Sequence, residues 1–533
     1  MTFLAATLLL LASMEAARAE PVSAAIGLTV FLEGTFLAGW GGTIVSVGFS
    51  LALSAISMAL APRSAGSVNS PDVKFNEKQS TPLKRIIYGR ARVGGALFFE
   101  ECKPPYLYLG ILIAYGEIDG IDGVYIGSNN VGLPYFTEGA EIIPQHQIKQ
   151  AASSQIVGGV ATTVPATFDY HDYLTVSLGY GKAAQAIDPI LAADFTSVSA
   201  DFRQRGIARA VLKCRWGDNQ DDYTRVWGQV QRPAPFLDAR GIKLYDPRNS
   251  RHDIADPATW TFSNNAILVI ANYLMADYGG RVDPSRVDWE RVAAEADWAD
   301  GLFVAKSGEA LRRYTIDGVI NLGQRPSDVL ASMGSAVGAV NRSCVIERGG
   351  RVWVAGRRPK PVVLTITDNL LCGGFKYRDA RPKREKVNRV KTRFTASERE
   401  YQVVDGPTVD DDDLQALDGE ILEATLSCPL TLDHRRVQRL ADLYIGESRI
   451  GRALECRCDI RALALADDEL IDGAVSVVSD LFPKINGTYA VSEMTIDLPF
   501  VDFKLQEYDA SIETAWNAAT DEQDFALSTV DVS

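Results

Sequence analysis

The most compact group of residues that could perform acid–base chemistry is Tyr170-His171-Asp172. A histidine beside a carboxylate can hold or transfer a proton, because its pKa lies near neutrality. The other three histidines, at 146, 252 and 434, are far apart, and the chain has neither a Gly-x-Ser-x-Gly nor a His-Glu-x-x-His motif. We therefore predict a turn or a hydrogen-bonded core site here, with no catalytic residue and no enzymatic activity.

The closest pair of cysteines is Cys456 and Cys458, two of seven cysteines in the chain. In a strand, a spacing of two places both side chains on one face, where a metal or redox pair is conceivable. The seven cysteines are scattered without Cys-x-x-Cys spacing, so they do not indicate a disulfide framework. Buried cysteine usually behaves as a small hydrophobic residue, and we predict that role for this pair, with no metal and no cofactor.

Two other segments partly match ligand-binding motifs. Asp119 and Asp122 lie in the turn-rich segment 116–123, but they lack the alternating ligand spacing and terminal glutamate of a calcium loop. Lys182 follows Gly181 as in a phosphate-binding loop, yet Ala183 stands where Ser or Thr is required. Neither calcium binding nor NTP hydrolysis is predicted.

The composition indicates a globular, multidomain protein. At 533 residues the chain is expected to form two to four domains, since one domain usually takes ~100–200 residues. Hydrophobic residues make up 47%, and 44 Gly with 23 Pro favour many turns and much antiparallel sheet. The net charge of -14 argues against broad binding to the phosphate backbone of nucleic acid. The expected fold class is α+β and β-rich.

The densest basic run covers residues 383–393 and raises the question of a nucleic-acid patch. Charged residues at positions 389, 391 and 393 alternate with Val390, Thr392 and Phe394, which favours a strand with one charged face. The acidic run Asp410 to Asp413 is expected in a solvated loop, although a contact between the basic and acidic runs of different subunits stays open.

The N-terminal segment is apolar and allows two interpretations. Residues 1–20 end in Ala17-Arg18-Ala19, which resembles a secretory cleavage site but lacks a basic region before it. Between 21 and 62 the single charged residue is Glu33, and residues 41–61 are long enough for a membrane-spanning helix of ~20 residues. Small residues recur every four positions, so a helix here could also pack closely against other helices. A breaker-rich linker, 64–71, follows.

Several helices and strands are predicted from periodicity and capping. Asn265 and Asp433 each precede an apolar helical pattern that they can cap, and Pro326 stands at the start of another helix. Glycine pairs and Asn-Gly mark hairpin turns. The predicted elements are strands at 86–88, 107–115, 124–127 and 313–320, helices at 266–274, 287–299, 326–337 and from 434 on, and hairpins at 344–354 and 483–489.

Five different motifs follow one another in a fixed order between about residues 80 and 500. They are Lys84–Gly95, Leu178-Gly179 followed by Gln185 and Asp188, Asp201–Lys213, Gly241–Arg248 and Gly487–Val491. In this order they resemble the central tail hub of long-tailed phages and gene transfer agents, a family related to the N-terminal half of the lambda tip attachment protein J. The resemblance rests on motif order and carries no catalytic signature.

The resemblance implies several β-barrel-like hub domains with inserted helices and an apolar helical N-terminal segment. The implied boundaries are an N-terminal segment 1–65, a first β-rich hub domain with an insertion 66–250, an α+β domain 251–385, a second barrel-like hub domain 386–505 and an acidic tail 506–533.

The implied function is structural: a homotrimeric hub at the distal end of the virion tail, made in the bacterial cytoplasm, that lines or closes the ejection channel. Implied partners are the distal tail and tail tube proteins, the tape-measure protein and tail fibre or receptor-binding proteins. DNA would pass without specific binding, and residues 21–62 could contact the host membrane. The alternative is a secreted or membrane-anchored β-rich cell-envelope protein.

Overall fold

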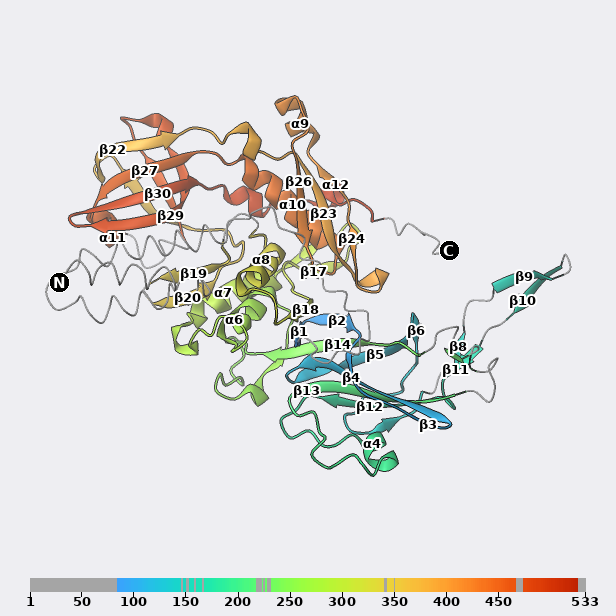
Figure 1. Cartoon of the computed structure of the whole chain (residues 1–533). Helices are drawn as coiled ribbons and strands as arrows, with labels where there is room; N and C mark the ends of the chain where they lie inside the picture. Colours follow the sequence, from blue (N-terminus) through green and yellow to red (C-terminus); the bar gives the residue numbers. More distant parts are fainter. Residues whose placement is uncertain are drawn as a thin grey trace, which may run out of the picture. The chain divides into compact units, whose positions relative to one another are not determined.

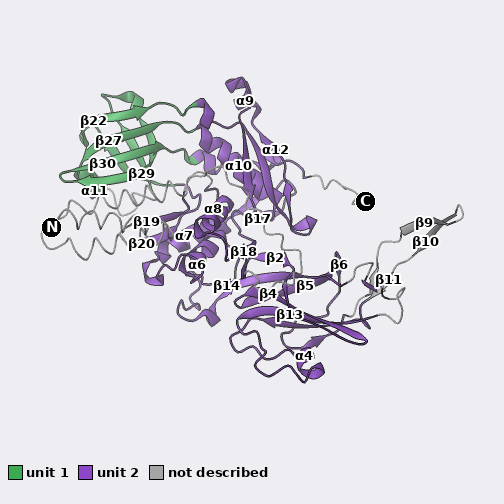
Figure 2. Ribbon diagram, viewed as in Figure 1, with its two compact units in different colours: residues 1–61, 360–382, 450–510 green, residues 62–359, 383–449, 511–533 purple. Residues whose placement is uncertain are grey.

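The computed structural model describes residues 84–144, 147–149, 153–157, 160–164, 167–216, 223, 226–227, 232–339, 343–348, 350–465 and 473–525. These residues form two compact units (Figure 2). The larger unit contains the described residues up to 359 together with 383–449 and 511–525, and the smaller unit contains 360–382 and 450–510. The predicted apolar N-terminal helix, cleavage site and linker lie outside the described residues. The five predicted domain boundaries stay a prediction.

The first part of the larger unit consists of two five-stranded sheets that share one core (Figure 1). One sheet has the order β3 (Ala96–Lys103), β4 (Tyr106–Tyr115), β13 (Ile207–Arg215), β12 (Leu174–Tyr180) and β7 (Glu141–Ile142). The other has β15 (Thr261–Phe262), β14 (Pro235–Leu244), β5 (Ile118–Ile126) and β6 (Asn129–Asn130), with β2 (Arg90–Val93) also on β14. Apolar side chains from both sheets are fully buried between them, as the predicted apolar strand 107–115 requires.

Most of segment 116–123 is not a turn, as the sequence suggested: residues 118–123 belong to strand β5. Two glycines made it resemble a turn, yet both sit inside the strand opposite β14. A Cβ on Gly120 would lie 2.6 Å from the Arg240 guanidinium, so glycine here makes room for that side chain. Gly120 therefore marks the close approach of an arginine.

Smaller elements complete the first part of the unit. Short helix α4 (Pro189–Asp194) and aromatic residues cover the outer face of the β3–β4–β13 sheet. Two separate strand pairs are formed by β8 (Gln147–Lys149) with β11 (Thr167–Asp169) and by β9 (Ser153–Val157) with β10 (Val160–Val164). Strand β1 (Arg85–Tyr88), predicted at 86–88, pairs instead with the distant β18 (Gly318–Asn321).

The middle of the larger unit is helical, as predicted. Helices α6 (Ala266–Met275), α7 (Trp289–Asp300) and α8 (Pro326–Ala336) are present, and Asn265 caps α6 by accepting hydrogen bonds from the N–H groups of Ile267 and Leu268. Two hairpins flank them: β16 (Leu302–Val304) with β17 (Ala310–Arg312), and β19 (Val345–Arg348) with β20 (Arg351–Val354). The pairing of Arg348 with Arg351 confirms the predicted hairpin at 344–354.

The predicted strand at 313–320 is wrong over its first half, because β18 begins only at Gly318. Before it, the backbone N–H of Ile316 donates to the carbonyl of Asn264, and that of Asp317 donates to the carbonyl of Leu430. These partners lie in loops, so the backbone groups are satisfied without a regular strand.

The last part of the larger unit is a four-stranded sheet against helix α10 (His434–Arg449). Strand β23 (Arg389–Ala396) pairs with β24 (Gln402–Asp405), β25 (Val409–Asp410) and β26 (Glu423–Cys428). The acidic run 410–413 is largely exposed, as predicted, but it is not a loop: Asp410 ends β25, and Asp411 caps α9 (Asp412–Asp418). A short helix, α12 (Ala518–Asp521), lies near the end of the described chain.

The smaller unit is a single six-stranded sheet that curls into a half-barrel (Figure 2, green). Its order is β21 (Val362–Thr367), β28 (Ala474–Val478), β29 (Gly487–Asp497), β30 (Phe500–Glu507), β27 (Ala453–Asp459) and β22 (Leu371–Arg378), and helix α11 (Arg461–Leu465) follows β27. The predicted Asn486-Gly487 turn is wrong in detail, because residues 479–486 together connect β28 to β29. Asn486 bonds Ser479 across this connection instead.

Candidate functional site

The first motif, 84–95, forms a joint between distant parts of the larger unit. Strand β1 pairs with β18, Gly89 turns the chain, and β2 then pairs with β14. Gly89 has φ +59°, and a Cβ there would lie 2.3 Å from the Asp317 Oδ1 atom. Both the left-handed conformation and the close carboxylate require glycine. The motif therefore encodes a tight crossing between two strand pairs.

Asp317 is the buried centre of this joint. Its carboxylate is 3% exposed at the residue level and accepts hydrogen bonds from the Arg90 N–H (2.9 Å) and from Asn264 Nδ2 (3.2 Å). Burial raises the pKa of Asp317, while these hydrogen bonds act in the opposite direction. A polar group buried this deeply is tolerated because it is hydrogen-bonded, so it fixes the turn at Gly89.

Arg92 stands on the other side of the joint and pairs with Asp238. Its Nε and Nη2 atoms donate to the two Asp238 oxygens at 2.7 and 3.0 Å. The guanidinium also lies 3.8 Å from the ring centroid of Tyr125 and 5.8 Å from that of Tyr401. Such two-pronged arginine–carboxylate bonds with a stacked ring fix direction as well as distance.

Tyr401 reaches this cluster from the connection between β23 and β24. It and Glu400 have φ values of +60° and +54°, a conformation that costs a non-glycine residue roughly 1–3 kcal/mol. Burial, followed by the Asp238 carboxylate, raises the pKa of Tyr401 to about 12. The strained backbone thus coincides with a contact between the β23 sheet and the first motif.

Asp119 and Asp122 of β5 pair with arginines. Arg240 donates to Asp119 through Nε (2.7 Å) and to Asp122 through Nη1 (2.7 Å), and Arg90 donates to Asp122 (2.8 Å). In the described part of the chain, no group of three or more His, Cys, Asp or Glu residues could hold a metal ion.

The Leu178–Asp188 and Asp201–Lys213 motifs meet in a second buried network. Asp188 caps α4 and lies 3.5 Å from Arg209 Nε, with both side chains at most 2% exposed. Gln185 accepts the Gly181 N–H and donates to three backbone carbonyls. Burial raises the pKa of Asp188 and lowers that of Arg209, so desolvation outweighs their mutual attraction.

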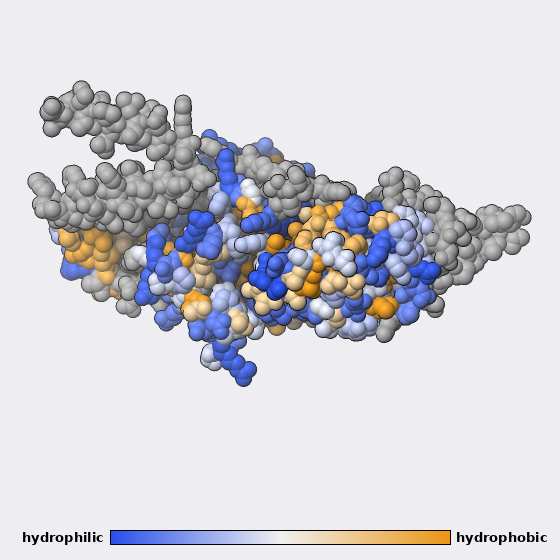
Figure 3. Space-filling view, turned by 60° about the horizontal axis from the view of Figure 1, so that its bottom comes forward, coloured by the Kyte–Doolittle hydropathy of each residue, from blue (hydrophilic) through white to orange (hydrophobic). Residues whose placement is uncertain are grey.

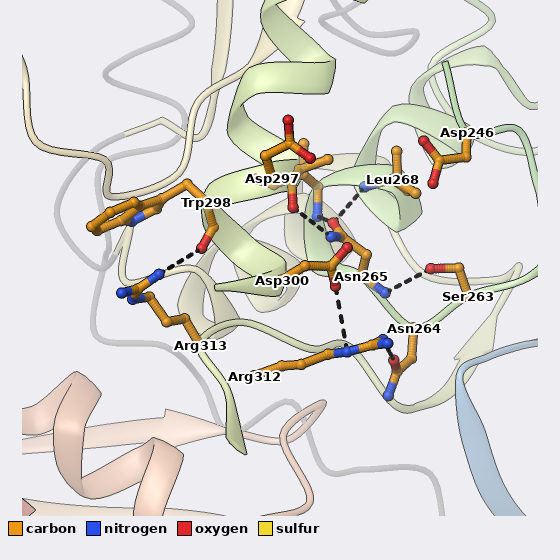
Figure 4. A network of polar contacts seen from close by, with 12 residues as sticks. Asp246, Ser263, Asn264, Asn265, Leu268, Asp297, Trp298, Asp300, Arg312 and Arg313 are labelled. Carbon is orange, nitrogen blue, oxygen red and sulfur yellow. Dashed lines mark hydrogen bonds and ion pairs between the residues drawn. The ribbon is translucent and has the colours of Figure 1, made fainter. Parts of the chain in front are cut away.

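A third network joins Gly241–Arg248 to the helices. Figure 4 draws four residues of its surroundings, Asp246, Asp297, Asp300 and Arg312, with Arg312 paired to Asp300. Arg248 bonds Asp246, Asp297 and Asp300 at 2.8 to 3.0 Å, and Arg312 lies 3.5 Å from Asp300. The Asp246 carboxylate, with the other two aspartates, holds the pKa of Arg248 well above its usual value. The motif thus fixes helix α7 and strand β17 against the end of β14.

The remaining sequence candidates stay apart. Tyr170 is buried in the core against Trp227, whereas His171 and Asp172 are exposed in a turn and 3.1 Å from each other. This agrees with the predicted turn. Cys456 and Cys458 lie on one buried face of β27 with their sulfur atoms 4.0 Å apart, as predicted. Lys182 pairs with Glu138 at 2.6 Å.

The basic run forms the predicted strand with one charged face, β23. Its cations are paired within the chain: Arg389 with Asp410, Lys391 with Glu423 and Arg393 with Asp405. The basic and acidic runs therefore meet in the same subunit, where neighbouring strands bring them together.

Sequence reasoning missed Asp317, Asp238 and Tyr401. Asp317 lies 227 positions from its partner in the first motif, Asp238 lies 146 positions from its partner, and Tyr401 lies more than 300 positions from Arg92. Residue spacing along the chain therefore could not indicate these contacts. The first motif did contain one indication, because it is rich in arginine and glycine. The arginines require carboxylate partners elsewhere in the chain, and the glycines allow another segment to approach closely.

A solved chain from the virion of a native gene transfer agent (GTA) particle shares this fold. The match has a TM-score of 0.51 and 14% identity, and covers 89% of this chain and 98% of that chain. The 43 kDa tail protein of prophage MuSo2 from Shewanella oneidensis (12% identity, TM-score 0.27) and the tail protein from Neisseria meningitidis MC58 (10%, 0.28) align over 81% of this chain and 99% and 100% of theirs. The TM-scores of these last two matches are too low to support a structural argument. No protein-family model and no curated protein matches the sequence.

Proposed function

We propose that this chain is a structural tail protein of a phage-like particle, acting as a homotrimeric hub at the distal end of the tail. The observation that carries the proposal is the fold shared with a chain of a gene transfer agent virion over 98% of that chain. The order of the five motifs supports it as well, and the first four of them form a strand crossing or polar networks in the described residues.

The geometry of the site suits such a role. We call the buried and paired groups around the first motif the polar joint. Its four aspartates and three arginines hold elements between residues 85 and 321, together with the 400–401 turn, in one arrangement; they are Asp119, Asp122, Asp238, Asp317, Arg90, Arg92 and Arg240. In this joint the arginines bind the carboxylates and stack on the tyrosine rings. Because these contacts connect distant elements of the unit, the joint is suited to maintaining its shape. A hub needs that property, since it must keep its form while DNA and other proteins pass.

The proposed neighbours are the tail tube and distal tail proteins on one side and fibre or receptor-binding proteins on the other. The net charge of -14 per copy supports passage of DNA without binding, provided that acidic residues face the channel. The apolar segment 21–62 is proposed to meet its copies near the axis, where it holds the tape-measure protein or enters the host membrane.

The test combines the oligomeric mass with the position in the particle. Native mass spectrometry of the full chain should give three times 58.0 kDa, and antibodies against it should label the distal tip of the tail in electron micrographs. A monomer, or labelling away from the tail axis, would overturn the hub proposal.

The rival function, a secreted or membrane-anchored protein of the cell envelope, rests on the apolar N-terminus alone. It predicts cleavage after Ala19 or a requirement for detergent. Among the described residues, no helix is both long and apolar enough to cross a membrane. Mass spectrometry of the mature N-terminus separates the two proposals, because a virion component should retain Met1 through Glu20.

A further inference from the structure

The larger unit contains a pocket of about 490 Å³. The end of β14, the segment 254–260 and the end of α6 form its wall, and the apolar part of the wall includes Ile242, Ile254, Trp260 and Met275. The volume lies within the ~300–1,000 Å³ that is usual for ligand sites. Figure 3 shows small hydrophobic groups scattered over a mostly hydrophilic face of the molecule, so apolar surface alone does not mark a site.

A buried amide distinguishes this pocket from ordinary apolar surface. Asn272 of α6 lines the pocket and is 8% exposed. Its Oδ1 atom accepts a hydrogen bond from the Tyr88 hydroxyl at 2.9 Å, and that hydroxyl lies 3.1 Å from the hydroxyl of Tyr278, which also lines the pocket. Asn272 Nδ2 forms no hydrogen bond with the part of the chain that the structure describes. Buried amides normally have partners, so this N–H group requires a ligand with a carbonyl or carboxylate oxygen.

The described part of the chain begins beside this pocket. Lys84, its first residue, places its ammonium group 4.5 Å from the ring centroid of Tyr115, and Tyr115 stands two positions before Glu117 of the pocket wall. Four residues after Lys84, Tyr88 reaches the pocket through its hydrogen bond to Asn272. The chain before Lys84 therefore enters β1 from the neighbourhood of the pocket.

The segment that precedes Lys84 carries one aromatic side chain. Residues 72–83 lie outside the described residues, and Phe75 among them is the only aromatic residue between Phe49 and Tyr88. Nine residues lead from Phe75 to Lys84, and an extended chain of that length reaches ~30 Å. Phe75 can therefore reach the pocket of its own chain.

Reach, and not charge, selects this segment. The pocket wall carries two carboxylates and one ammonium group, Glu117, Asp277 and Lys243, and Glu117 pairs with Lys243 at 3.2 Å. Residues 72–83 contain two acidic and two basic residues, so neither side has a strong charge of one sign. A short tether keeps the local concentration of an attached segment in the millimolar range, so one apolar side chain can occupy a site to which it would bind weakly as a free ligand.

We propose that residues 72–83 fold back onto the larger unit of their own chain, with Phe75 in the pocket and a backbone carbonyl of the segment accepting a hydrogen bond from Asn272. A peptide suits both parts of the site, because it supplies an apolar side chain and a carbonyl in one ligand. The contact fixes where the apolar segment 21–62 leaves the larger unit, since ten residues, ~35 Å when extended, separate residue 62 from residue 72. The inference goes beyond the proposed hub and does not depend on it, because every contact lies within one chain.

The first test measures hydrogen exchange of the full chain with Phe75→Ser. Amide exchange in residues 254–260 and 275–278 should become at least ~3-fold faster, because the pocket loses its occupant. The matched control is Val68→Ser, which removes an apolar side chain from the preceding linker and should leave exchange in both segments unchanged. Equal exchange rates in the wild type and in Phe75→Ser would overturn the proposal.

The second test changes the pocket and follows tryptic cleavage after Lys74 and Lys78. Ala258→Glu should speed this cleavage at least ~10-fold, because a carboxylate in the apolar wall releases the segment. Ala255→Glu is the matched control, since Ala255 is exposed in the same segment but does not line the pocket, and it should change the rate less than ~2-fold. Circular dichroism confirms that each variant is folded. The same cleavage rate in both variants would contradict docking in this pocket.

The third test is cross-linking of the double variant Phe75→Cys/Ala258→Cys under mild oxidation. A disulfide within one chain is expected, detected by peptide mass spectrometry of material that runs as a monomer on a denaturing gel. Each single variant controls for the native cysteines, of which Cys102 is exposed. A disulfide between two copies, or none, would overturn docking within one chain. These outcomes leave the hub proposal untouched, because its own test is the oligomeric mass and the position in the particle.

Discussion

The two units of this protein use buried polar groups in opposite ways. The larger unit buries ionised or strongly polar side chains in its interior, among them Asp188, Arg209, Asp317, Arg357 and Glu513. In the described part of the smaller unit, Ser479 is the one polar residue that is buried to this degree. Its core consists of aliphatic and aromatic residues and two cysteines, and its charged pairs lie on the outside of the sheet.

This difference indicates two ways of specifying a structure. A half-barrel with alternating strands can be specified by apolar packing, because each strand has one inward face. The larger unit connects segments that are hundreds of residues apart through loops and crossings, where apolar contact alone would allow several arrangements. Directional hydrogen bonds between buried charges select one arrangement, and they make the unit sensitive to the loss of either partner.

The largest expected effect comes from breaking the buried pair in the larger unit. Arg209→Met should lower the free energy of unfolding by about 3–5 kcal/mol, because it leaves the Asp188 carboxylate buried without a cation and frees the carbonyls of Arg203 and Ala186. Hydrogen exchange in β13 and tryptophan fluorescence during denaturation measure the change. The fluorescence does not report on the smaller unit, because no tryptophan lies in residues 360–382 or 450–510. A loss below 1 kcal/mol would contradict the special role of the buried pair.

A smaller effect is expected from closing the space at the polar joint. Gly241→Ala should destabilise the larger unit by about 1–3 kcal/mol, since a Cβ there would lie 2.1 Å from the Ile87 carbonyl oxygen. The matched control is Gly374→Ala in the smaller unit, where a Cβ meets nothing within 4 Å and the change should stay within about 0.5 kcal/mol. Similar melting temperatures for the two variants would show that the crossing is loosely packed.

One carboxylate in each unit, Asp442 and Asp502, should contribute to the pH dependence of stability with opposite sign. Burial, with repulsion from Asp521 and Asp411 and partial compensation by Arg439, raises the pKa of Asp442 on α10 to about 6. Its folded pKa exceeds the ordinary value, so the stability it contributes is complete below about pH 4 and is lost as the pH rises through 6. Asp442→Asn should therefore stabilise the larger unit by about 1–2 kcal/mol at pH 7 and have no effect near pH 4.

The comparison for this titration is Asp502 in the half-barrel. Arg457 lowers the pKa of Asp502, so its contribution is present at neutral pH and lost on acidification below about pH 4. Asp502→Asn should accordingly destabilise slightly at pH 7 and leave stability at low pH unchanged. The free energy of unfolding of both variants can be measured from pH 4 to 8. A change of the same sign at pH 7 in Asp442→Asn and Asp502→Asn would refute the contrast.

The smallest effect is expected from removing a charge at the surface of the half-barrel. Lys504 pairs with Glu493 at 2.7 Å, but the side chains are 52% and 41% exposed. Lys504→Met makes the same kind of change as Arg209→Met, yet it should cost only about 0–1 kcal/mol, since water and salt screen the pair. Hydrogen exchange of β29 and β30 measures it. A cost comparable to that of Arg209→Met would remove the distinction between the units.

Much of the local structure could be predicted from the sequence. Asn265 and Asp433 mark helix starts because their side chains accept the first backbone N–H groups, and both helices begin where expected. Alternation at 389–394 and the spacing of Cys456 and Cys458 gave strands with the correct buried faces. These signals are local, and neighbouring residues decide them.

The errors share one cause. Gly120 suggested a turn, Asn486-Gly487 suggested a two-residue hairpin, and Asp410 suggested a loop. Gly120 instead admits Arg240, Asn486 belongs to a longer connection, and Asp410 pairs with Arg389 on another strand. A glycine that admits an arginine from another strand cannot be told from one that turns the chain until that strand is in place.

The sequence by itself determined the β-rich α+β class, the helix starts, the faces of the strands and the arginine-rich first motif, because all of these follow from periodicity and capping. The tertiary structure alone decided which carboxylates meet those arginines, that Tyr401 reaches Arg92, and that the basic and acidic runs pair within one chain. The physical reason is that burial and pairing of charge depend on distances in space between residues that are remote in the chain.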